Sequence, residues 1–350
     1  MRLERSLCTV LLNRLYDRGD TVLSVEHPGE DIGELVRIEL GKHDGCTVHF
    51  THDRDGYANA RTTVARSYGD RVADDLPSPQ DYINAFVAAG ILDVSNRDEI
   101  EQFLDRYGDP NLLDGHKPVM AIFDTNLIPW RLDETLGLRH PEAGLGYVNG
   151  FVLPTGIRDE LDWDVKCDDT RPFVEAFGEE FEAYWNQPLG AVRVGRLGLE
   201  QYRSIRDIQQ ADEIVSETGD KEIIAALDEY QSERRREVLL FSNDRNIVER
   251  SRSHRMPAQR VDLPDDVPKS ATATWSEVGN LLFQLAVQFG ILTLPAVTLF
   301  GVWSGKEGID WQRERIRLDC RSPTIKEQLA GDLNIIETFN ELRTSAVTHD

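Results

Sequence analysis

Two short apolar runs indicate the architecture of this chain: Val119-Met-Ala-Ile-Phe-Asp-Thr-Asn-Leu127 and Glu237-Val-Leu-Leu-Phe-Ser-Asn-Asp244. Each run has the length and apolar character of a buried strand, and each leads into an aspartate followed by a helix pattern. The sequence between them alternates further strand and helix patterns, which is typical of a parallel sheet covered by helices. Because ligands gather beyond the carboxyl ends of parallel strands, Asp124 and Asp244 are expected at an edge where sites form.

Turn-rich sequence separates this middle segment from the two ends of the chain. Residues 108–118 are rich in Gly, Pro and Asp and residues 264–271 in Pro and Asp, which marks both as boundaries. We predict an α/β domain at 118–266, an N-terminal α+β accessory domain at 1–116 and a C-terminal α-β-β-α extension at 270–350. Helices are expected at 81–92, 98–107, 275–288 and 324–342, and strands at 46–51, 297–303 and 309–318.

The chain is strongly acidic, with 39 Lys and Arg against 62 Asp and Glu and a net charge of −23. Such a surface normally repels a polyanion. Seven of the basic residues are Lys, and the acids are spread along the whole chain, a composition that suits a salt-rich cytoplasm. At ~1 M salt the Debye length falls to about 3 Å, so the repulsion would be largely screened. The charge therefore does not exclude a nucleic acid partner, and it indicates a halophile.

The cysteines and the apolar segments favour a cytoplasmic protein. Four cysteines lie far apart without the spacing of a zinc site or a disulfide framework, so we expect reduced thiols. The N-terminus has no cleavable signal pattern. Residues 281–303 are long enough to span a bilayer, but Gln284, Gln288 and Pro295 interrupt them, and we expect no membrane partner. The cysteines are Cys8, Cys46, Cys167 and Cys320.

Two further acids lie on expected helices of the middle segment. Glu160 follows a short apolar run and stands between Ile157 and Leu161, beside the stripe that a helix would bury. Asp220 lies in the first turn of a helix pattern, where Asp also complements the helix dipole. Each acid alone has a structural explanation, and Asp124 could equally be a helix N-cap. Asp159, next to Glu160, is a second choice.

The set of four acids carries more information than any member. Asp124, Glu160, Asp220 and Asp244 occur in the order expected of one α/β unit and could converge on one pocket. Four carboxylates in a single pocket would repel each other strongly, and a divalent cation would relieve that repulsion. A ligand set of oxygen atoms suits Mg²⁺ or Mn²⁺, whereas the lack of His and Cys argues against zinc.

These motifs resemble the acidic motifs of PIN-domain ribonucleases over residues 118–266. The resemblance implies a parallel sheet sandwiched between helices, a PIN-like three-layer fold, and a site that hydrolyses RNA phosphodiester bonds with Mg²⁺ or Mn²⁺. It implies that Asp124, Glu160, Asp220 and Asp244 bind the metal, and that Asn126 and Ser242 support them. It also allows a homodimer. Together with the acidic composition, it suggests a protein of a halophilic archaeon.

Two arginine-rich segments flank the last strand of the acidic set. We expect them to hold phosphates of a single-stranded or structured RNA, although a solvated surface paired with the chain's own acids is the alternative. Toxin members of the PIN family are barely more than the catalytic unit. The long segments that flank the middle domain here therefore make RNA processing or decay a better prediction than toxin action. The arginines are Arg234, Arg235, Arg236, Arg245, Arg250, Arg252 and Arg255.

Two other functions remain open from the sequence. The fold could be an inactive RNA-binding or protein-interaction scaffold, although none of the acids of the motif is replaced. Asp124 could instead be a nucleophile that forms an aspartyl phosphate. That chemistry calls for a second acid two residues later, and position 126 is Asn.

Overall fold

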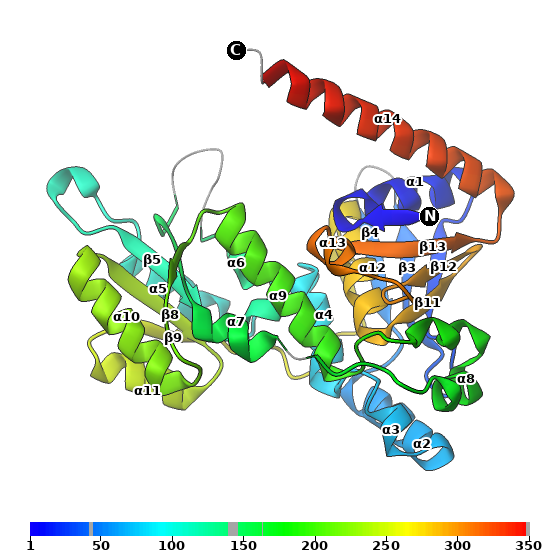
Figure 1. Cartoon of the computed structure of the whole chain (residues 1–350), viewed down its shortest axis with the longest axis horizontal. Coiled ribbons are helices and arrows are strands. Elements are labelled where there is room, and N and C mark those ends of the chain that lie inside the picture. The colour runs from blue at the N-terminus through cyan, green and yellow to red at the C-terminus, as the bar shows by residue number, and fades with distance from the viewer. Residues whose placement is uncertain (42–44, 139–145, 163, 348–350) are drawn as a thin grey trace. The chain divides into compact units, whose positions relative to one another are not determined.

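The structure is a computed structural model that describes residues 1–41, 45–138, 146–162 and 164–347. The described chain forms two compact units. The antiparallel unit comprises Met1–Leu76, Cys167–Gln187 and Val267–Asp350, and the parallel unit comprises Pro77–Lys166 and Pro188–Asp266. Each unit contains its own sheet (Figure 1).

The sheet of the parallel unit has the strand order β7-β6-β5-β8-β9, and each neighbouring pair is parallel. The chain enters the sheet at β5, moves outward through β6 to β7, and then crosses to β8 and β9 on the other side. The direction of winding therefore reverses between β5 and β8, the position where open α/β sheets bind ligands. This sheet confirms the predicted mixed α/β class with a parallel sheet. The strands are β5 Val119–Phe123, β6 Gly150–Pro154, β7 Asp212–Ile214, β8 Glu237–Ser242 and β9 Ala258–Arg260.

Burial on both faces explains why these segments form central strands. Every residue of β5 and β6 is buried, as expected for parallel strands covered by helices. Phe123 stacks against Phe241 of β8 with ring centroids 5.3 Å apart, and against Phe151 of β6 at 6.4 Å. The aromatic rings thus hold the three central strands together at the end where the acids follow.

Helices cover the parallel sheet and differ in what they contact. Helices α10 and α11 pack on each other and on β8, while α9 packs on β6, α7 and η3 (Figure 1). Helix α4 contacts η3 and α6, and α5 contacts β9. The helices of this unit are α4 Pro79–Ala88, α5 Arg97–Tyr107, η2 Leu112–Asp114, η3 Ile128–Trp130, α6 Leu132–Thr135, α7 Thr155–Leu161, α9 Ala191–Asp207, α10 Asp220–Arg234 and α11 Arg245–Ser253.

The sheet of the antiparallel unit has the strand order β1-β13-β12-β11-β2-β3-β4-β10. Its strands are β1 Arg2–Glu4, β2 Val22–Glu26, β3 Glu34–Leu40, β4 Cys46–Phe50, β10 Ser270–Ala273, β11 Ile291–Leu294, β12 Val297–Phe300 and β13 Arg315–Cys320. Its helices are η1 Arg5–Leu7, α1 Cys8–Arg18, α2 Arg54–Tyr68, α3 Asp70–Ala73, α8 Arg171–Phe177, η4 Glu179–Tyr184, α12 Trp275–Phe289, α13 Gly308–Gln312 and α14 Pro323–Val347.

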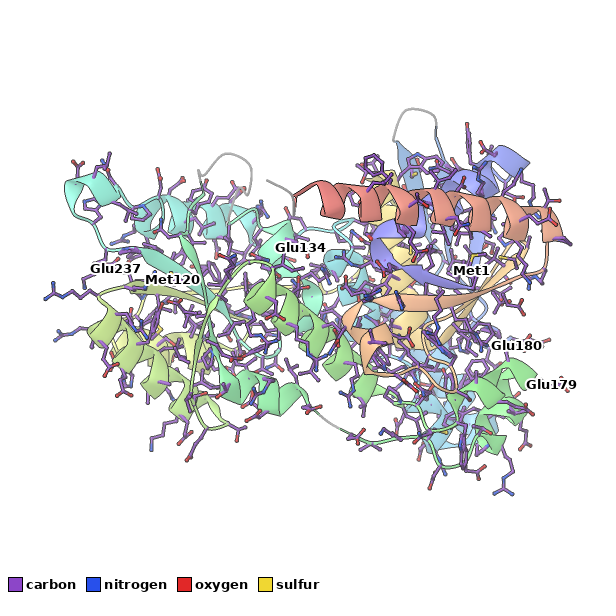
Figure 2. The ribbon with its side chains drawn as sticks, turned by 45° about the horizontal axis from the view of Figure 1, so that its top comes forward. Met1, Met120, Glu134, Glu179, Glu180 and Glu237 are labelled. Carbon is purple, nitrogen blue, oxygen red and sulfur yellow. The ribbon has the colours of Figure 1, made fainter. Side chains whose placement is uncertain are left out.

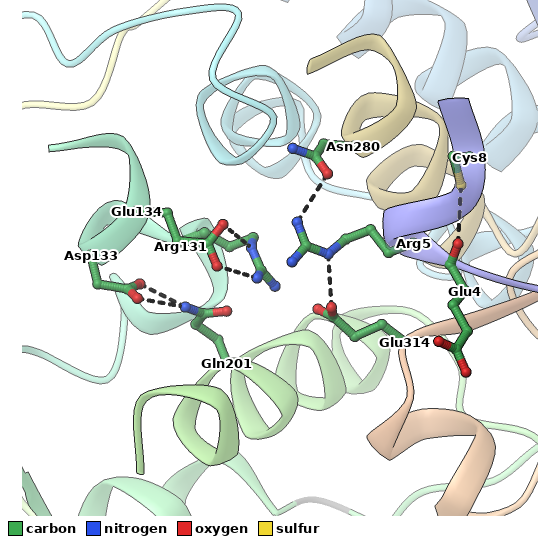
Figure 3. Close-up of polar contacts among 9 residues, drawn as sticks. All are labelled: Glu4, Arg5, Cys8, Arg131, Asp133, Glu134, Gln201, Asn280 and Glu314. Carbon is green, nitrogen blue, oxygen red and sulfur yellow. Dashed lines mark hydrogen bonds and ion pairs between the residues drawn. The ribbon is translucent and has the colours of Figure 1, made fainter. Parts of the chain in front are cut away.

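The two ends of the chain build this sheet together, which differs from the three domains predicted at 1–116, 118–266 and 270–350. Strand β1 pairs with β13, and β10 pairs with β4. Arg5 donates to Glu314 at 2.8 Å and to Asn280 Oδ1 at 2.9 Å, which ties the chain start to its last third (Figure 3). The N-terminal and C-terminal segments therefore complete one sheet through these two strand pairs.

Two segments also belong to units other than those predicted for them. Residues 167–187, expected in the α/β domain, pack in the antiparallel unit, where Phe177 lies edge-on to His27 at 4.7 Å and Tyr184 donates to the Phe289 carbonyl at 2.8 Å. Helices α4 and α5, expected in the N-terminal domain, belong to the parallel unit. Both reassignments depend on contacts between residues far apart in sequence.

The apolar segment 281–303 is a helix followed by a hairpin. A capping box of Thr274 and Glu277 begins α12, and Gly290, with φ +77°, ends it before β11 and β12 pair. Among the described residues, no helix combines the length and apolar character needed to cross a bilayer. The strand expected at 309–318 is instead the short helix α13 followed by β13.

Candidate active site

Asp124 is the first residue after β5 and lies at the carboxyl edge of the parallel sheet. Its backbone N–H donates to the Phe241 carbonyl at 2.9 Å, so it is still paired with β8. Its carbonyl accepts from the Leu127 N–H at 2.8 Å in a tight turn that leads into η3. No α-helix begins at this turn, and the structure therefore does not use Asp124 as an α-helix N-cap.

Ser242 links the two aspartates that follow β5 and β8. Its hydroxyl, fully buried, donates to Asp124 Oδ2 at 2.9 Å and accepts from the Asp244 N–H at 2.9 Å. Asp244 itself caps α11, because its Oδ1 accepts from the Asn246 N–H at 2.7 Å. Its second carboxylate oxygen has no hydrogen bond to any residue that the structure describes.

Glu160 connects three segments at the same edge. Its Oε2 accepts from the Thr125 hydroxyl, and its Oε1 accepts from the Gly219 N–H at 2.7 Å. Glu160 is half-buried on α7 between the buried Ile157 and Leu161, as its helical position predicted. The carboxylate therefore joins the end of β5 to the start of α10.

Asp220 and Glu160 lie close enough to Asp124 to change its protonation. Burial raises the pKa of Asp124 to about 6, and the negative charges of Asp220 and Glu160 add to that rise. The Ser242 hydroxyl and the Thr125 N–H oppose it by hydrogen bonding the carboxylate. Asp220 is exposed in the first turn of α10. Asp124, Glu160 and Asp220 are thus electrostatically coupled, and Asp244 joins them through Ser242.

Hydrogen bonds between the start of α7 and the segment before α10 hold the elements of Glu160 and Asp220 close together. The Ser216 hydroxyl accepts from the Gly156 N–H at 2.9 Å, and Thr155 Oγ1 donates to the Ser216 carbonyl at 3.1 Å. A Cβ on Gly156 would lie 2.2 Å from the Glu217 carbonyl oxygen. The approach of the two segments therefore requires glycine at position 156.

The acids match Mg²⁺ or Mn²⁺ in ligand type. They offer carboxylate oxygens and no nitrogen or sulfur, and a cation would offset both the burial and the smaller charge repulsion that raise the pKa of Asp124. Over the described ranges, no three His, Cys, Asp or Glu side chains lie close enough together to form a metal cage. Mg²⁺ commonly retains several waters and is bound through one or two carboxylates, so such a cage is not required.

A cavity of about 320 Å³ lies beside Glu160 in the parallel unit. Asn126, exposed at the end of β5, and Asn243, exposed after β8, both line it. Its lining is completed by Gln80, Asp81, Asn84, Thr125, Pro129, Trp130, Glu160, Leu161, Ala191, Val194 and Gly195. The residues from α4 were missed in the sequence because α4 was assigned to another domain. Asn84 inside the apolar run 82–88 was the available signal, because a polar residue buried in such a run needs a partner.

The arginines after Asp244 follow α11 away from the acids. Arg245 is exposed in the first turn of the helix and pairs with Glu249 at 3.0 Å. Arg252 donates twice to the Ala258 carbonyl, at 3.1 and 2.8 Å. Arg250 lies in the last turn of α11 and Arg255 beyond its end. The structure therefore places Arg245 next to the acids and the other three progressively farther along the helix.

Arg234, Arg235 and Arg236 lie at the amino-terminal ends of the parallel strands, whereas the acids lie at the carboxyl ends. They precede β8, and Glu237 at the start of β8 pairs with Val119, the first residue of β5 and the neighbour of Met120 (Figure 2). Arg236 lies 3.6 Å from Asp212 at the start of β7. A strand rises ~3.3 Å per residue, so the length of β8 separates these arginines from Asp244 by roughly 20 Å. They cannot flank the same cleft as the acids, which corrects the prediction.

A second buried carboxylate, that of Asp133, lies away from the carboxyl edge of the parallel sheet. Asp133 of α6 accepts from Gln201 Nε2 at 2.7 and 2.8 Å (Figure 3) and from Gln209 Nε2 at 2.6 Å. Burial, followed by the charge of Glu134, raises the pKa of Asp133 to about 6. Its partners are amide groups of α9 and of the turn that follows it, so its role is to join α6 to that part of the unit.

The chain is a mixed α/β protein with a group of acids at the carboxyl ends of β5 and β8, where the winding of its parallel sheet reverses. No protein-family model matches the chain, and comparisons with curated proteins and with solved structures find no match. The function is therefore argued from the site.

Proposed function

We propose that the chain is a metal-dependent endoribonuclease of the PIN-like kind, acting in RNA processing or decay. One observation carries the proposal: at the carboxyl edge of β5 and β8, where the sheet reverses its winding, Ser242 bridges Asp124 and Asp244, and the charges of Asp220 and Glu160 act on Asp124. Sites of α/β sheets form at such positions. The resemblance of these motifs to PIN-domain ribonucleases adds the reaction and the substrate.

The residues of the edge have separate tasks in this proposal. The resemblance assigns metal binding to Asp124, Glu160, Asp220 and Asp244; of these, Asp124 and one neighbouring acid would hold Mg²⁺ or Mn²⁺ directly, and waters would complete the coordination. When bound, such a cation polarises the scissile phosphate and lowers the pKa of a water that attacks it. Ser242 orients the Asp124 carboxylate, while Thr125 and the Gly219 N–H orient Glu160. No side chain is needed as the nucleophile.

Arg245 is the arginine placed to meet an approaching phosphate. It is exposed beside Asp244, and its pair with Glu249 is a surface ion pair of the kind that contributes little to stability. Exchanging Glu249 for a phosphate oxygen would therefore cost little. In a salt-rich cytoplasm the repulsion between RNA and a net charge of −23 would also be screened.

Cleavage of RNA by matched variants tests this function. Mixed single-stranded and structured RNAs are incubated in molar KCl with Mn²⁺, Mg²⁺ or EDTA, beside a phosphatase substrate. Asp124→Asn keeps an oxygen for Ser242, and Asp244→Asn keeps the oxygen that caps α11, so both variants should fold. Asp159→Asn is the control, because Asp159 is exposed on the same helix as Glu160 and pairs with Arg158.

We expect metal-dependent cleavage by the wild type and by Asp159→Asn, and a loss of about a hundredfold or more in the two site variants. If the folded wild type binds RNA but does not cleave it with either metal, the scaffold function replaces the nuclease. If it hydrolyses the phosphatase substrate instead, Asp124 as a nucleophile becomes the better explanation.

A further inference from the structure

A second cavity of the parallel unit, of about 460 Å³, lies beside β9, the last strand of its sheet. One wall is a single side of α5, since its lining positions there are three and four residues apart. The other wall is formed by the end of α11 and the start of β9. The lining residues are Glu99, Gln102, Phe103, Arg106, Tyr107, Arg252, Pro257, Ala258 and Gln259.

The cavity contains two arginines whose charges the acids of this chain do not pair. Within the described ranges, neither Arg106 nor Arg252 forms an ion pair with a carboxylate. By contrast, Arg97 on the same helix as Arg106 pairs with Asp93 at 3.5 Å and with Glu101 at 3.0 Å. The positive charges of the cavity are therefore available to an anion that enters it.

Both guanidinium groups are oriented by uncharged partners. Arg252 donates from Nε and Nη2 to the Ala258 carbonyl at 3.1 and 2.8 Å, and the guanidinium retains further N–H donors on Nη1. Arg106 lies over the Tyr107 ring, with its Cζ 5.1 Å from the ring centroid. Stacking of this kind positions an arginine and leaves its edge donors for hydrogen bonds. The two groups thus keep both charge and donors for a ligand.

Glu99 is the one acid among the described lining residues, and it lies away from Arg106. Seven residues of α5 separate the two, which is roughly 10 Å along the helix axis. Asn96 Nδ2 donates to Glu99 Oε2 at 3.4 Å and to the Arg260 carbonyl at 2.9 Å, so Glu99 lies toward the carboxyl end of β9. The positive part of the cavity is therefore the part beside the start of β9.

The cavity lies within reach of a strand that occupies the acidic edge. Asp244 caps α11, and Arg252 follows eight residues later, roughly 12 Å along the helix. Arg260 at the end of β9 is in register with Ser242 at the end of β8. An extended chain of nucleotides at the acids can therefore continue along β9 to Arg252 and Arg106.

We propose, resting on the nuclease function above, that this cavity binds a backbone phosphate of the RNA strand at a distance from the cleaved bond. Arg252 and Arg106 donate to the phosphate oxygens, which the planar fork of arginine matches. An aromatic ring beside positive charges is typical of sites for single-stranded nucleic acid, because bases stack on such rings. The Tyr107 ring therefore favours RNA over an acidic peptide as the ligand.

RNA binding measured in EDTA tests the cavity without cleavage. A fluorescent single strand of about 12 nucleotides, within the roughly 4 to 16 that such sites cover, is titrated by anisotropy over a series of KCl concentrations. Arg106→Gln and Arg252→Gln each remove one charge. Arg171→Gln is the matched control, because Arg171 is 90% exposed on α8 of the antiparallel unit and pairs with Asp169.

We expect each cavity variant to weaken RNA binding about threefold to tenfold at the lowest salt concentration, and the control to bind as the wild type does. For a single strand, the logarithm of the affinity falls with that of the salt concentration by about 0.7 per neutralised phosphate. Each cavity variant should reduce this slope by about that amount, which a purely structural role would not do.

Gln102→Arg provides a test that misfolding cannot imitate. Gln102 is exposed on α5, one turn before Arg106, and lines the cavity. An arginine there adds a third positive charge and should tighten RNA binding about threefold with a steeper salt slope. Gln102→Glu, which keeps the size of the side chain and adds a negative charge, should weaken binding.

The outcomes separate this inference from the proposed function. If RNA binds through Arg106 and Arg252 but neither Mg²⁺ nor Mn²⁺ supports cleavage, the phosphate site stands and the nuclease fails. If RNA is cleaved but Arg106→Gln, Arg252→Gln and Gln102→Arg bind it as the wild type does, the phosphate site is overturned and the nuclease stands. Displacement of the RNA by poly-glutamate as effectively as by unlabelled RNA of equal charge would overturn RNA as the ligand.

Discussion

Removing the Ser242 hydroxyl should destabilise the acidic edge by an amount that its two contacts define. Ser242→Ala deletes a donor to Asp124 Oδ2 at 2.9 Å and an acceptor for the Asp244 N–H at 2.9 Å, and the hydroxyl is fully buried. A hydrogen bond to a charged group contributes about 1.5 to 3 kcal/mol, and an unpaired N–H adds about 1 kcal/mol or more. We expect Ser242→Ala to lower the free energy of unfolding by about 2 to 4 kcal/mol.

Hydrogen exchange measured by mass spectrometry on peptides from β5 and β8 would report this loss where it arises. Because the chain has two compact units, global urea unfolding could mix their transitions. Ser253→Ala is the control, since its exposed hydroxyl donates only to the Arg250 carbonyl and its loss should cost about 0.5 kcal/mol or less.

The same variant should also lower metal-dependent cleavage, because Asp124 loses the group that orients it. A change in opening free energy within about 0.5 kcal/mol of the control would refute the bridging role of Ser242. Unchanged cleavage with a large loss of stability would restrict that role to structure.

Three other substitutions test separate features. Burial raises the pKa of Asp133 to about 6, above its unfolded value, so its ionisation costs stability as the pH rises from about 4 to about 6. Asp133→Asn keeps one oxygen for Gln201 and removes the ionisation, so it should abolish a pH dependence of up to about 3 kcal/mol in the opening free energy measured by hydrogen exchange on α6 peptides; an unchanged pH profile would contradict it. Gly156→Ala, whose Cβ would lie 2.2 Å from the Glu217 carbonyl oxygen, should cost about 1 to 3 kcal/mol and lower cleavage, and full activity at wild-type stability would be the contrary result. Leu329→Ala, at a fully buried position of α14, should cost about 2 to 5 kcal/mol in thermal unfolding but leave RNA cleavage intact when folded; loss of cleavage in the folded variant would contradict separate roles for the units.

The parallel sheet was predictable because its signals are local. The strands β5 and β8 are apolar runs buried on both faces, and the positions of Asp124 and Asp244 follow from where those runs end. Glu160 lies beside the buried stripe of its helix, as its spacing indicated. Neither apolar run by itself indicated the order of the strands or the reversal of the winding direction between β5 and β8.

The remaining features depend on pairing between distant segments. Nothing local in Leu3 indicates that it lies opposite Ile316, or that Ala271 lies opposite Val48. The position of Arg236 was mispredicted because closeness in sequence to Asp244 was taken for closeness in space, although β8 separates them. The cavity residues of α4 were missed for the same reason, since their neighbours come from elsewhere in the chain.

The strand order of the antiparallel sheet has a consequence for synthesis on the ribosome. The strands of the parallel unit have all been made once residue 260 is added, but β4 lacks its second neighbour, β10, until residues 270–273, and β1 lacks its neighbour, β13, until residues 315–320. We therefore expect the parallel unit to fold on the nascent chain while strands β1 to β4 still lack some of the strands with which they pair. Such edges invite pairing with other chains, so an arrested or truncated product should aggregate where the full-length chain does not.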